Sequence, residues 1–216
     1  MKISEILKKS PKKYIVKFSN DYFIEVDKKT LADKNLVENL ELTESEFLEL
    51  KRQLESINAE KIILNKLSAR KRSEFEIRSF LKNADISAEI IEQTIDKYKK
   101  LKQINDYDFA ESFINDKLHL SKKSLKTIKS ELQKFKISND IINELFAKQK
   151  NADTNIELEN CKKLIQKRLK LKKITDLEKH KITRYLLFKG YNFNTISQAF
   201  SEISDANLAN ECHMPI

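Results

Sequence analysis

The chain has 216 residues, of which 42 are Lys or Arg and 33 are Asp or Glu, and its formal net charge is +9. One Gly and two Pro leave few positions for tight turns and favour long helices. Two cysteines, Cys161 and Cys212, form neither a disulfide framework nor a metal-binding spacing, which is typical of a reducing compartment. No apolar run approaches the ~18 residues of a membrane span. No signal-peptide core follows Met1. We therefore expect a cytoplasmic protein that does not enter a membrane.

The N-terminal residues predict a small β-structure. Residues 5–9 have the pattern of a short helix that Pro11 would end. Two segments rich in β-branched and aromatic residues, 12–18 and 22–26, are separated by the turn signal Ser19-Asn20-Asp21 and predict a β-hairpin. A lone hairpin is marginally stable in water, so we expect it to pack on the helices that follow.

A helix follows this hairpin. Thr43 and Glu46 have the spacing of a capping box, in which each residue satisfies a backbone N–H of the other. The apolar residues after them recur at helical spacing, and we expect the helix to run to about Leu67. Residues 1–67 are therefore predicted to form an N-terminal extension.

The rest of the chain repeats one helical pattern. A second capping box, Ser73 with Glu76, opens the first copy. Its apolar positions are Ile77, Leu81, Ile86, Ile90, Ile91 and Ile95. A shift of 51 residues gives Ile128, Leu132, Ile137, Ile141, Ile142 and Phe146, and a shift of 105 gives Ile182, Leu186, Tyr191, Thr195, Ile196 and Phe200. Only Thr195 departs from the pattern, so the sequence predicts three tandem repeats, at residues 68–120, 121–173 and 174–216.

Each repeat is predicted to contain three helices. In the first repeat they span 73–82, 87–98 and 106–118, with Asp106 as the N-cap of the third. The third helix is duplicated after 51 residues, which places Cys161 where the first copy has Ala110. We therefore expect Cys161 to be a small buried residue rather than a reactive thiol.

The last repeat differs in detail. Thr175 and Glu178 form its capping box, and Gly190, the only glycine, is the expected helix C-cap. Its third helix is predicted to be short, near Asn207, with a frayed tail at 211–216.

Charge follows the same period. Residues 61–82 contain seven Lys/Arg and two acidic residues, and residues 117–136 contain seven and one. Residues 161–184 contain ten Lys/Arg and two acidic residues. The intervening segments 83–116 and 137–160 are acidic, with net charges of −4 and −3. Lysine-rich helices are often only solvated faces, but a basic run that returns in each repeat predicts a stripe for an acidic partner.

The sequence contains no pattern typical of catalysis. One glycine cannot form a phosphate-binding loop, and His119, His180 and His213 have no ligand spacing. No Ser or Cys lies beside a His in a nucleophile motif. Aromatic residues such as Tyr107 and Tyr185 could stack on bases, although helical spacing makes core positions the more frequent role. We expect no enzyme activity, no cofactor and no metal.

Two segments resemble the signature runs of the RecX family of bacterial RecA regulators. They are residues 67–78, Leu-Ser-Ala-Arg-Lys-Arg-Ser-Glu-Phe-Glu-Ile-Arg, and residues 104–110, Ile-Asn-Asp-Tyr-Asp-Phe-Ala. The resemblance covers about residues 12–205 and implies a mainly α fold: a curved array of three tandem three-helix repeats after an N-terminal β-hairpin and helix. The family often has glycines in the second repeat, where this chain has Lys123, Ser124, Phe135 and Lys136.

The resemblance also implies a function. The protein would bind the RecA recombinase filament on single-stranded DNA and modulate it, most often by inhibition, as a monomer that also binds DNA weakly. The basic residues that we expect to contact this partner are Arg70, Arg72, Arg78, Lys122, Lys123, Lys126, Lys129, Lys181 and Arg184. The alternative is a helical-repeat protein that binds DNA or RNA directly, with no recombinase partner.

Overall fold

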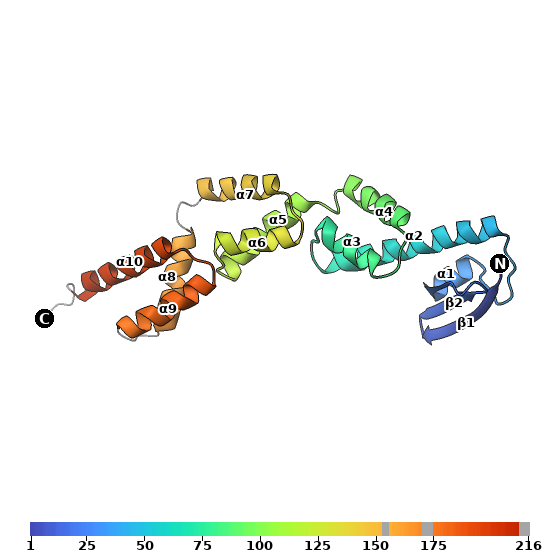
Figure 1. Ribbon diagram of the computed structural model, residues 1–216, viewed down its shortest axis with the longest axis horizontal. Coiled ribbons are helices and arrows are strands. Elements are labelled where there is room, and N and C mark those ends of the chain that lie inside the picture. The colour runs from blue at the N-terminus through green and yellow to red at the C-terminus, as the bar shows by residue number, and fades with distance from the viewer. Residues whose placement is uncertain (153–155, 170–174, 212–216) are drawn as a thin grey trace. The chain divides into compact units, whose positions relative to one another are not determined.

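The computed structural model describes residues 1–152, 156–169 and 175–211. The chain divides into two compact units, Met1–Ile104 and Asn105–Ile216 (Figure 1). Helices predominate in both units. Over the described residues, no helix is both long enough and apolar enough to cross a membrane.

The first unit begins with a three-stranded antiparallel sheet in the order β1-β2-β3. Strands β2 (Lys13–Phe18) and β3 (Phe23–Asp27) form the predicted hairpin, with Val16 paired to Ile24. The helix predicted at residues 5–9 was wrong, because these residues belong to β1 (Ile3–Ser10), which pairs with β2. Pairing with β2 supplies hydrogen bonds and a buried face that local spacing could not reveal.

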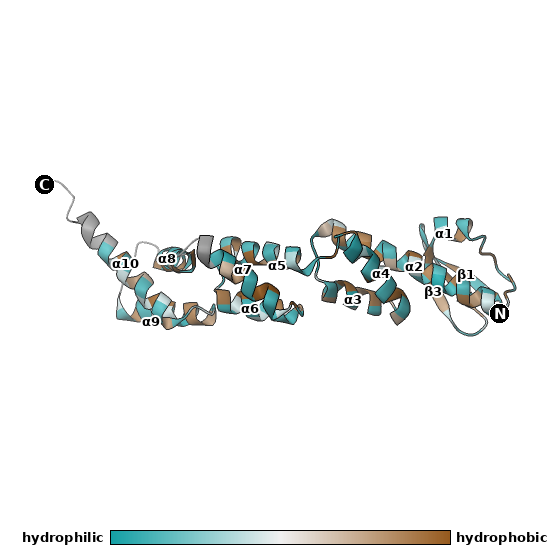
Figure 2. Ribbon diagram, turned by 90° about the horizontal axis from the view of Figure 1, so that it is seen from above, coloured by the Kyte–Doolittle hydropathy of each residue, from teal (hydrophilic) through white to brown (hydrophobic). Residues whose placement is uncertain are grey.

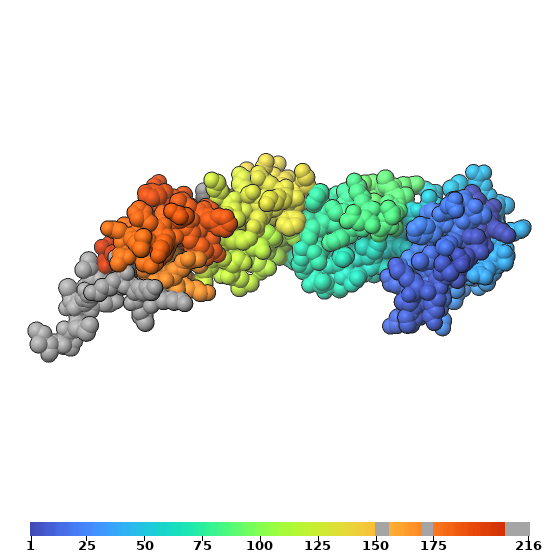
Figure 3. All heavy atoms as spheres, turned by 60° about the horizontal axis from the view of Figure 1, so that its bottom comes forward, coloured from blue at the N-terminus to red at the C-terminus, as the bar shows by residue number. Residues whose placement is uncertain are grey.

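The sheet packs against the helices that follow it, as predicted. Figure 3 shows the dark blue atoms of the N-terminal residues next to the lighter blue atoms of the residues that follow them. Helix α1 (Lys28–Asp33) is short, and α2 (Glu44–Ala69) is 26 residues long. The predicted capping box of Thr43 and Glu46 is present at the start of α2. Phe47 and Leu54 of α2 join Val16 and Phe18 of the sheet in one core.

The C-terminal half of α2 contributes to a second core. It packs with α3 (Glu74–Lys82) and α4 (Ala88–Lys100) around Ile77, Leu81 and Ile91, which are almost fully buried. Three helices therefore share this core, and α2 belongs to both cores of the first unit.

The second unit contains two further three-helix groups. The first consists of α5 (Asp106–Asn115) with the π-helical turn η1 (Asp116–Leu120), α6 (Leu125–Lys134) and α7 (Asn139–Ala152). The second consists of α8 (Ile156–Leu169), α9 (Asp176–Phe188) and α10 (Phe193–Glu211). Figure 2 shows hydrophobic and hydrophilic residues interleaved along these helices, as amphipathic helices require.

The repeat pattern correctly predicts equivalent core positions. Ile77, Ile128 and Ile182 are at most 2% exposed, and the corresponding leucines Leu81, Leu132 and Leu186 are fully buried. The same shift of 51 residues relates Ala59, Ala110 and Cys161, in the helices before the capped ones, and all three are fully buried. The expectation of a small buried residue at Cys161 is confirmed.

The cores group the helices one helix earlier than the sequence period suggested. Each core includes the helix that precedes the capped one: α2 before α3, α5 before α6, and α8 before α9. The boundaries at 68, 121 and 174 remain a proposal based on the period.

Three local predictions were wrong. Asn105, not Asp106, is the N-cap of α5, and its side chain accepts hydrogen bonds from the N–H groups of Tyr107 and Asp108. The helix predicted at 106–118 changes to π-helical geometry at Asp116. Residues around Asn207 continue α10 instead of forming a separate helix. Of the tail predicted at 211–216, Glu211 ends α10, and residues 212–216, with Cys212 and His213, lie outside the described residues.

Candidate partner-binding surface

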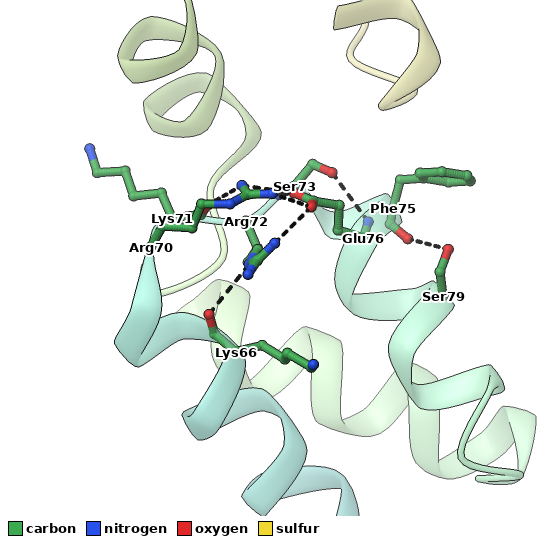
Figure 4. A network of polar contacts seen from close by, with 8 residues as sticks. All are labelled: Lys66, Arg70, Lys71, Arg72, Ser73, Phe75, Glu76 and Ser79. Carbon is green, nitrogen blue, oxygen red and sulfur yellow. Dashed lines mark hydrogen bonds and ion pairs between the residues drawn. The ribbon is translucent and has the colours of Figure 1, made fainter. Parts of the chain in front are cut away.

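The first predicted cations surround the N-terminus of α3. Ser73 accepts a hydrogen bond from the N–H of Glu76, and the Glu76 carboxylate accepts one from the N–H of Ser73 (Figure 4). The same carboxylate binds Arg70 at 2.6 Å and Arg72 at 3.0 Å. Arg72 also donates to the carbonyl of Lys66 at the end of α2. Glu76 therefore holds both arginines against the chain.

Arg78 is also paired within the first unit. Its guanidinium contacts Glu74 at 2.9 Å, one turn earlier on α3, and Glu92 of α4. The two carboxylates raise the pKa of Arg78 above its usual value, with Glu92 the larger cause. Lys99 and Arg78 both lower the pKa of Glu74. Each of these charges has an internal partner.

The predicted cations of the second repeat lie in different surroundings. Lys123 forms an ion pair with Glu131, and Lys129 lies 3.5 Å from the side-chain oxygen of Asn143. Lys126 is exposed. Lys122 is half-buried and has a left-handed backbone with φ of 48°.

Of the two cations predicted on α9, Lys181 is exposed and lies 3.7 Å from Glu178. Arg184 is also exposed.

Lys122 lines a groove that we call the Tyr185 groove, with a volume of about 510 Å³. It is formed by the segment between η1 and α6, by α8 and by the C-terminal end of α9. The residues that line it are Leu120, Ser121, Lys122, Lys163, Leu164, Lys167, Arg168, Tyr185 and Lys189. Among the described residues, five cations and no carboxylate line the groove. Positive charge that is not neutralised within the chain attracts anions, and the concave wall concentrates this field.

Tyr185 organises the cations on one side of this groove. The Arg168 guanidinium lies 3.6 Å from the centroid of the Tyr185 ring, and the Lys189 ammonium lies 5.4 Å from it. Cation–π contacts of this kind fix the positions of charged side chains without neutralising them. The groove therefore presents ordered and available positive charge.

Hydrogen bonds between the two helical groups hold the walls of the groove. The Tyr191 hydroxyl donates to the carbonyl of Lys122 at 2.8 Å, and the Thr127 hydroxyl donates to the carbonyl of Lys189 at 3.0 Å. Asn160, which is buried, donates to the carbonyl of Leu118 at 2.8 Å. These contacts tie η1, α6, α8 and α9 together around the groove.

The core beneath the groove does not favour nucleophilic chemistry. Burial raises the pKa of the Cys161 thiol to about 12, and the nearby Glu157 carboxylate adds to this effect. Burial also raises the pKa of Glu157 itself. A thiol with such a pKa stays protonated near neutral pH, and the protonated form is a poor nucleophile.

Sequence reasoning missed four of the five groove cations. Lys163, Lys167 and Arg168 lie on α8, and Lys189 follows α9. For the three on α8, the signal was the excess of ten Lys/Arg over two acids in residues 161–184, and Lys189 lies outside that segment. That count could not show which of the ten converge, because the convergence depends on the packing of α8 against α9.

Comparison with known proteins gives consistent matches. The models for the first, second and third three-helix domains of RecX match residues 59–97, 105–145 and 155–200. The matched segments include part of α2 before α3, α5 before α6, and α8 before α9, which is the grouping that the cores show.

Curated relatives named Regulatory protein RecX match nearly the whole chain. The protein from Listeria welshimeri is 30% identical over 95% of this chain and 77% of its own length. The protein from Streptococcus sanguinis is 29% identical over 94% of this chain and 77% of its own length.

Solved structures support the fold. A crystal structure of regulatory protein RecX superposes with a TM-score of 0.61 and 22% identity, over 93% of this chain and 98% of the other. RecX from Lactobacillus salivarius superposes with a TM-score of 0.60 and 26% identity, over 69% of this chain and 97% of the other. With three family domains in order and relatives that match almost end to end, the chain belongs to the RecX family of regulatory proteins.

Proposed function

We propose that this protein binds the RecA filament on single-stranded DNA and limits the activity of the recombinase. The observation that carries the proposal is the Tyr185 groove, where five cations converge and no carboxylate lines the wall among the described residues. A nucleoprotein filament offers phosphates and carboxylates as anions for such a surface. Membership of a regulatory family supports a stoichiometric role rather than a catalytic one.

We rank the predicted contact residues by whether they already have a carboxylate partner within the chain. Arg70, Arg72 and Arg78 have carboxylate partners within the chain, so a partner would have to compete with Glu76, Glu74 or Glu92 for them. No carboxylate among the described residues lines the Tyr185 groove, so its cations require no such exchange there. We therefore propose the Tyr185 groove as the principal contact, with Lys126, Lys181 and Arg184 as exposed charges that can add to it.

The proposal is tested by co-sedimentation of the full chain with RecA filaments assembled on single-stranded DNA. We expect the wild-type chain to pellet with the filament and to pellet much less with bare DNA. Lys163→Gln/Lys167→Gln should reduce pelleting, because both side chains are exposed and line the groove. The control Lys134→Gln/Lys136→Gln removes the same charge from exposed positions outside the groove and should pellet like wild type. Failure of the wild-type chain to pellet with filaments would refute the proposal.

Direct binding of nucleic acid is the second candidate function. Tyr185 in the wall of the groove favours it, because an aromatic ring among cations is typical of surfaces that bind single strands. Equal pelleting with bare DNA and with the filament would support this function over a recombinase partner. A steep fall in bare-DNA binding with salt would accompany it.

A further inference from the structure

A second groove lies in the first unit, beside the sheet. We call it the β3 groove; its volume is about 800 Å³. Strand β3, helix α2 and the turn between α3 and α4 form its walls. Its lining includes all of β3, together with Glu55, Asn58 and Ile62 of α2 and Asp85 and Ile86 of the turn.

The groove runs along the unpaired edge of β3. Strand β3 is the last strand of the sheet, and only its β2 side is paired. In an antiparallel pair, successive residues direct their backbone groups alternately toward the partner strand and away from it. The hydrogen bond from the Phe18 N–H to the Tyr22 carbonyl fixes which residues face β2. Ile24 and Val26 therefore bond to β2, while Phe23 and Glu25 direct their backbone groups outward. Asn58 confirms this direction, because its amide donates to the Glu25 carbonyl at 2.7 Å from α2.

Part of this edge is available for pairing. In the described part of the chain, the outward N–H groups of Phe23 and Glu25 have no hydrogen-bond partner. The Phe23 side chain is 65% exposed. An exposed strand edge of this kind accepts a further strand, which would lie about 4.8 Å away. The groove provides room for that strand.

The charges of the groove indicate which strand would fit. Glu25 is paired with Lys9 and Lys13, and Asp27 is paired with Lys61. Among the described residues, Asp21 and Asp85 form no ion pair, and both are exposed. Over the whole lining, five carboxylates outnumber three lysines, so the net charge of the groove is negative and favours a basic segment.

The apolar residues of the lining indicate that the bound segment also has apolar residues at every second position. Ile62 and Ile86 lie on the side of the groove that continues into the helical core. In an added strand, successive side chains point to opposite faces. One face would meet these isoleucines, and the other would face solvent and the acidic groups.

We propose that the β3 groove binds an extended segment of a partner protein in which apolar and basic residues alternate, and that this segment adds to β3 as a fourth strand. Backbone hydrogen bonds to Phe23 and Glu25 would supply affinity, and the alternation would supply specificity. This surface is independent of the Tyr185 groove, since each lies in a different unit.

The test measures binding of a fluorescein-labelled peptide of six residues, alternating valine and lysine, to the full chain by fluorescence anisotropy. Phe23→Pro is the informative variant, because proline removes an outward N–H and is tolerated on edge strands at such positions. Phe23→Ala is the matched control, since it removes the same ring and keeps the N–H. We expect Phe23→Pro to weaken binding at least about tenfold relative to Phe23→Ala, as one lost hydrogen bond and a steric block imply.

A second probe keeps the proposal testable if the proline variant does not fold. A peptide of the same sequence with an N-methyl group on every residue has no N–H on either edge, cannot pair as a strand and should not bind wild type. A peptide of alternating valine and glutamate should bind at least about fivefold more weakly than the lysine peptide, because the groove is acidic. Equal binding of the N-methylated peptide, equal binding to folded Phe23→Pro, or no binding of the lysine peptide would overturn the proposal. A chain that dimerises in sedimentation equilibrium through Phe23 would also overturn it, since the occupant would then be a second copy.

Discussion

Gly190 occupies a position that no other residue fits without strain. Its φ is +90°, and a Cβ atom placed there would lie 2.1 Å from the Thr127 hydroxyl oxygen and 2.5 Å from that of Ser124. Gly190→Ala should therefore destabilise the second unit by about 1–3 kcal/mol, the usual cost of a strained backbone and overpacking. Urea unfolding measures this loss.

The control for Gly190 is its neighbour. Lys189→Ala removes a half-buried side chain and leaves the backbone and the Thr127 hydrogen bond in place. It should change the free energy of unfolding by no more than about 1 kcal/mol, the value of its exposed cation–π contact with Tyr185. A loss in Gly190→Ala no larger than this would contradict the steric argument.

Leu132 tests the repeat pattern at a single side chain. It is fully buried in the core that α5, α6 and α7 share. Leu132→Ala should cost about 2–5 kcal/mol, because it leaves a cavity in a close-packed core. Leu177, 65% exposed on α9, supplies the control, and Leu177→Ala should cost less than about 0.5 kcal/mol. Similar urea midpoints for the two variants would show that Leu132 is not a core residue.

At the scale of one element, Asp27 joins the sheet to α1. Its carboxylate accepts the N–H of Thr30 as the N-cap of α1 and pairs with Lys61 of α2 at 2.6 Å. Lys61 and the Thr30 N–H lower the pKa of Asp27 to about 2. A lowered carboxyl pKa stabilises the fold above the unfolded-state value near 4, and this stabilisation is lost as the pH falls from about 4 to 2.

Asp27→Asn removes the negative charge of this side chain and keeps the helix cap, because asparagine caps helices as well as aspartate does. We expect the variant to be less stable than wild type at pH 7 and equally stable near pH 2, in urea unfolding at several pH values. Asp33→Asn removes one carboxylate at an exposed position at the end of the same helix, outside the cap, and controls for the loss of one charge. A constant difference between Asp27→Asn and wild type from pH 7 to 2 would mean that the pair with Lys61 does not stabilise the fold.

Helix starts and core positions could be predicted because their causes are local. Ser73 and Thr175 cap helices through their own hydroxyl groups, as their capping-box spacing predicted. Ser124, which was not predicted as a cap, does the same 51 residues from each of them. Strand β1 could not be predicted, because Ile3 is buried only through pairing with Phe18 and contact with residues near Leu40. Pro11, in the turn after β1, can end either a helix or a strand, so it does not distinguish the two.

At the scale of the whole molecule, the charge pattern predicted where cations lie in the sequence but not which carboxylates pair with them in the fold. Arg78 is neutralised in part by Glu92 on the neighbouring helix, a contact that sequence spacing does not reveal. Conversely, Lys163 and Lys189 are 26 positions apart and share the Tyr185 groove because α8 packs with α9. The sequence predicted that the surface carries positive charge. Tertiary packing determines which of the positive side chains are free to contact a partner.

The salt dependence of filament binding tests this distribution of charge. If Lys163 and Lys167 contact phosphates of single-stranded DNA in the filament, each lost contact lowers the slope of log K against log salt by about 0.7. Lys163→Gln/Lys167→Gln should therefore reduce the slope by about 1.4, measured by co-sedimentation with RecA filaments at several salt concentrations. Circular dichroism should show an unchanged fold, because both side chains are exposed and form no ion pair among the described residues.

The control is again Lys134→Gln/Lys136→Gln, which lowers the net charge by the same amount at exposed positions outside the groove. A slope that falls equally in both variants would mean that net charge, rather than the groove, governs binding. If these lysines instead contact carboxylates of the recombinase, the loss of each exposed pair would weaken binding by only about 0–1 kcal/mol and would change the slope little. An unchanged affinity and slope in Lys163→Gln/Lys167→Gln would remove the groove from the interface, because uncompensated cations in contact with an anionic filament cannot be deleted without loss.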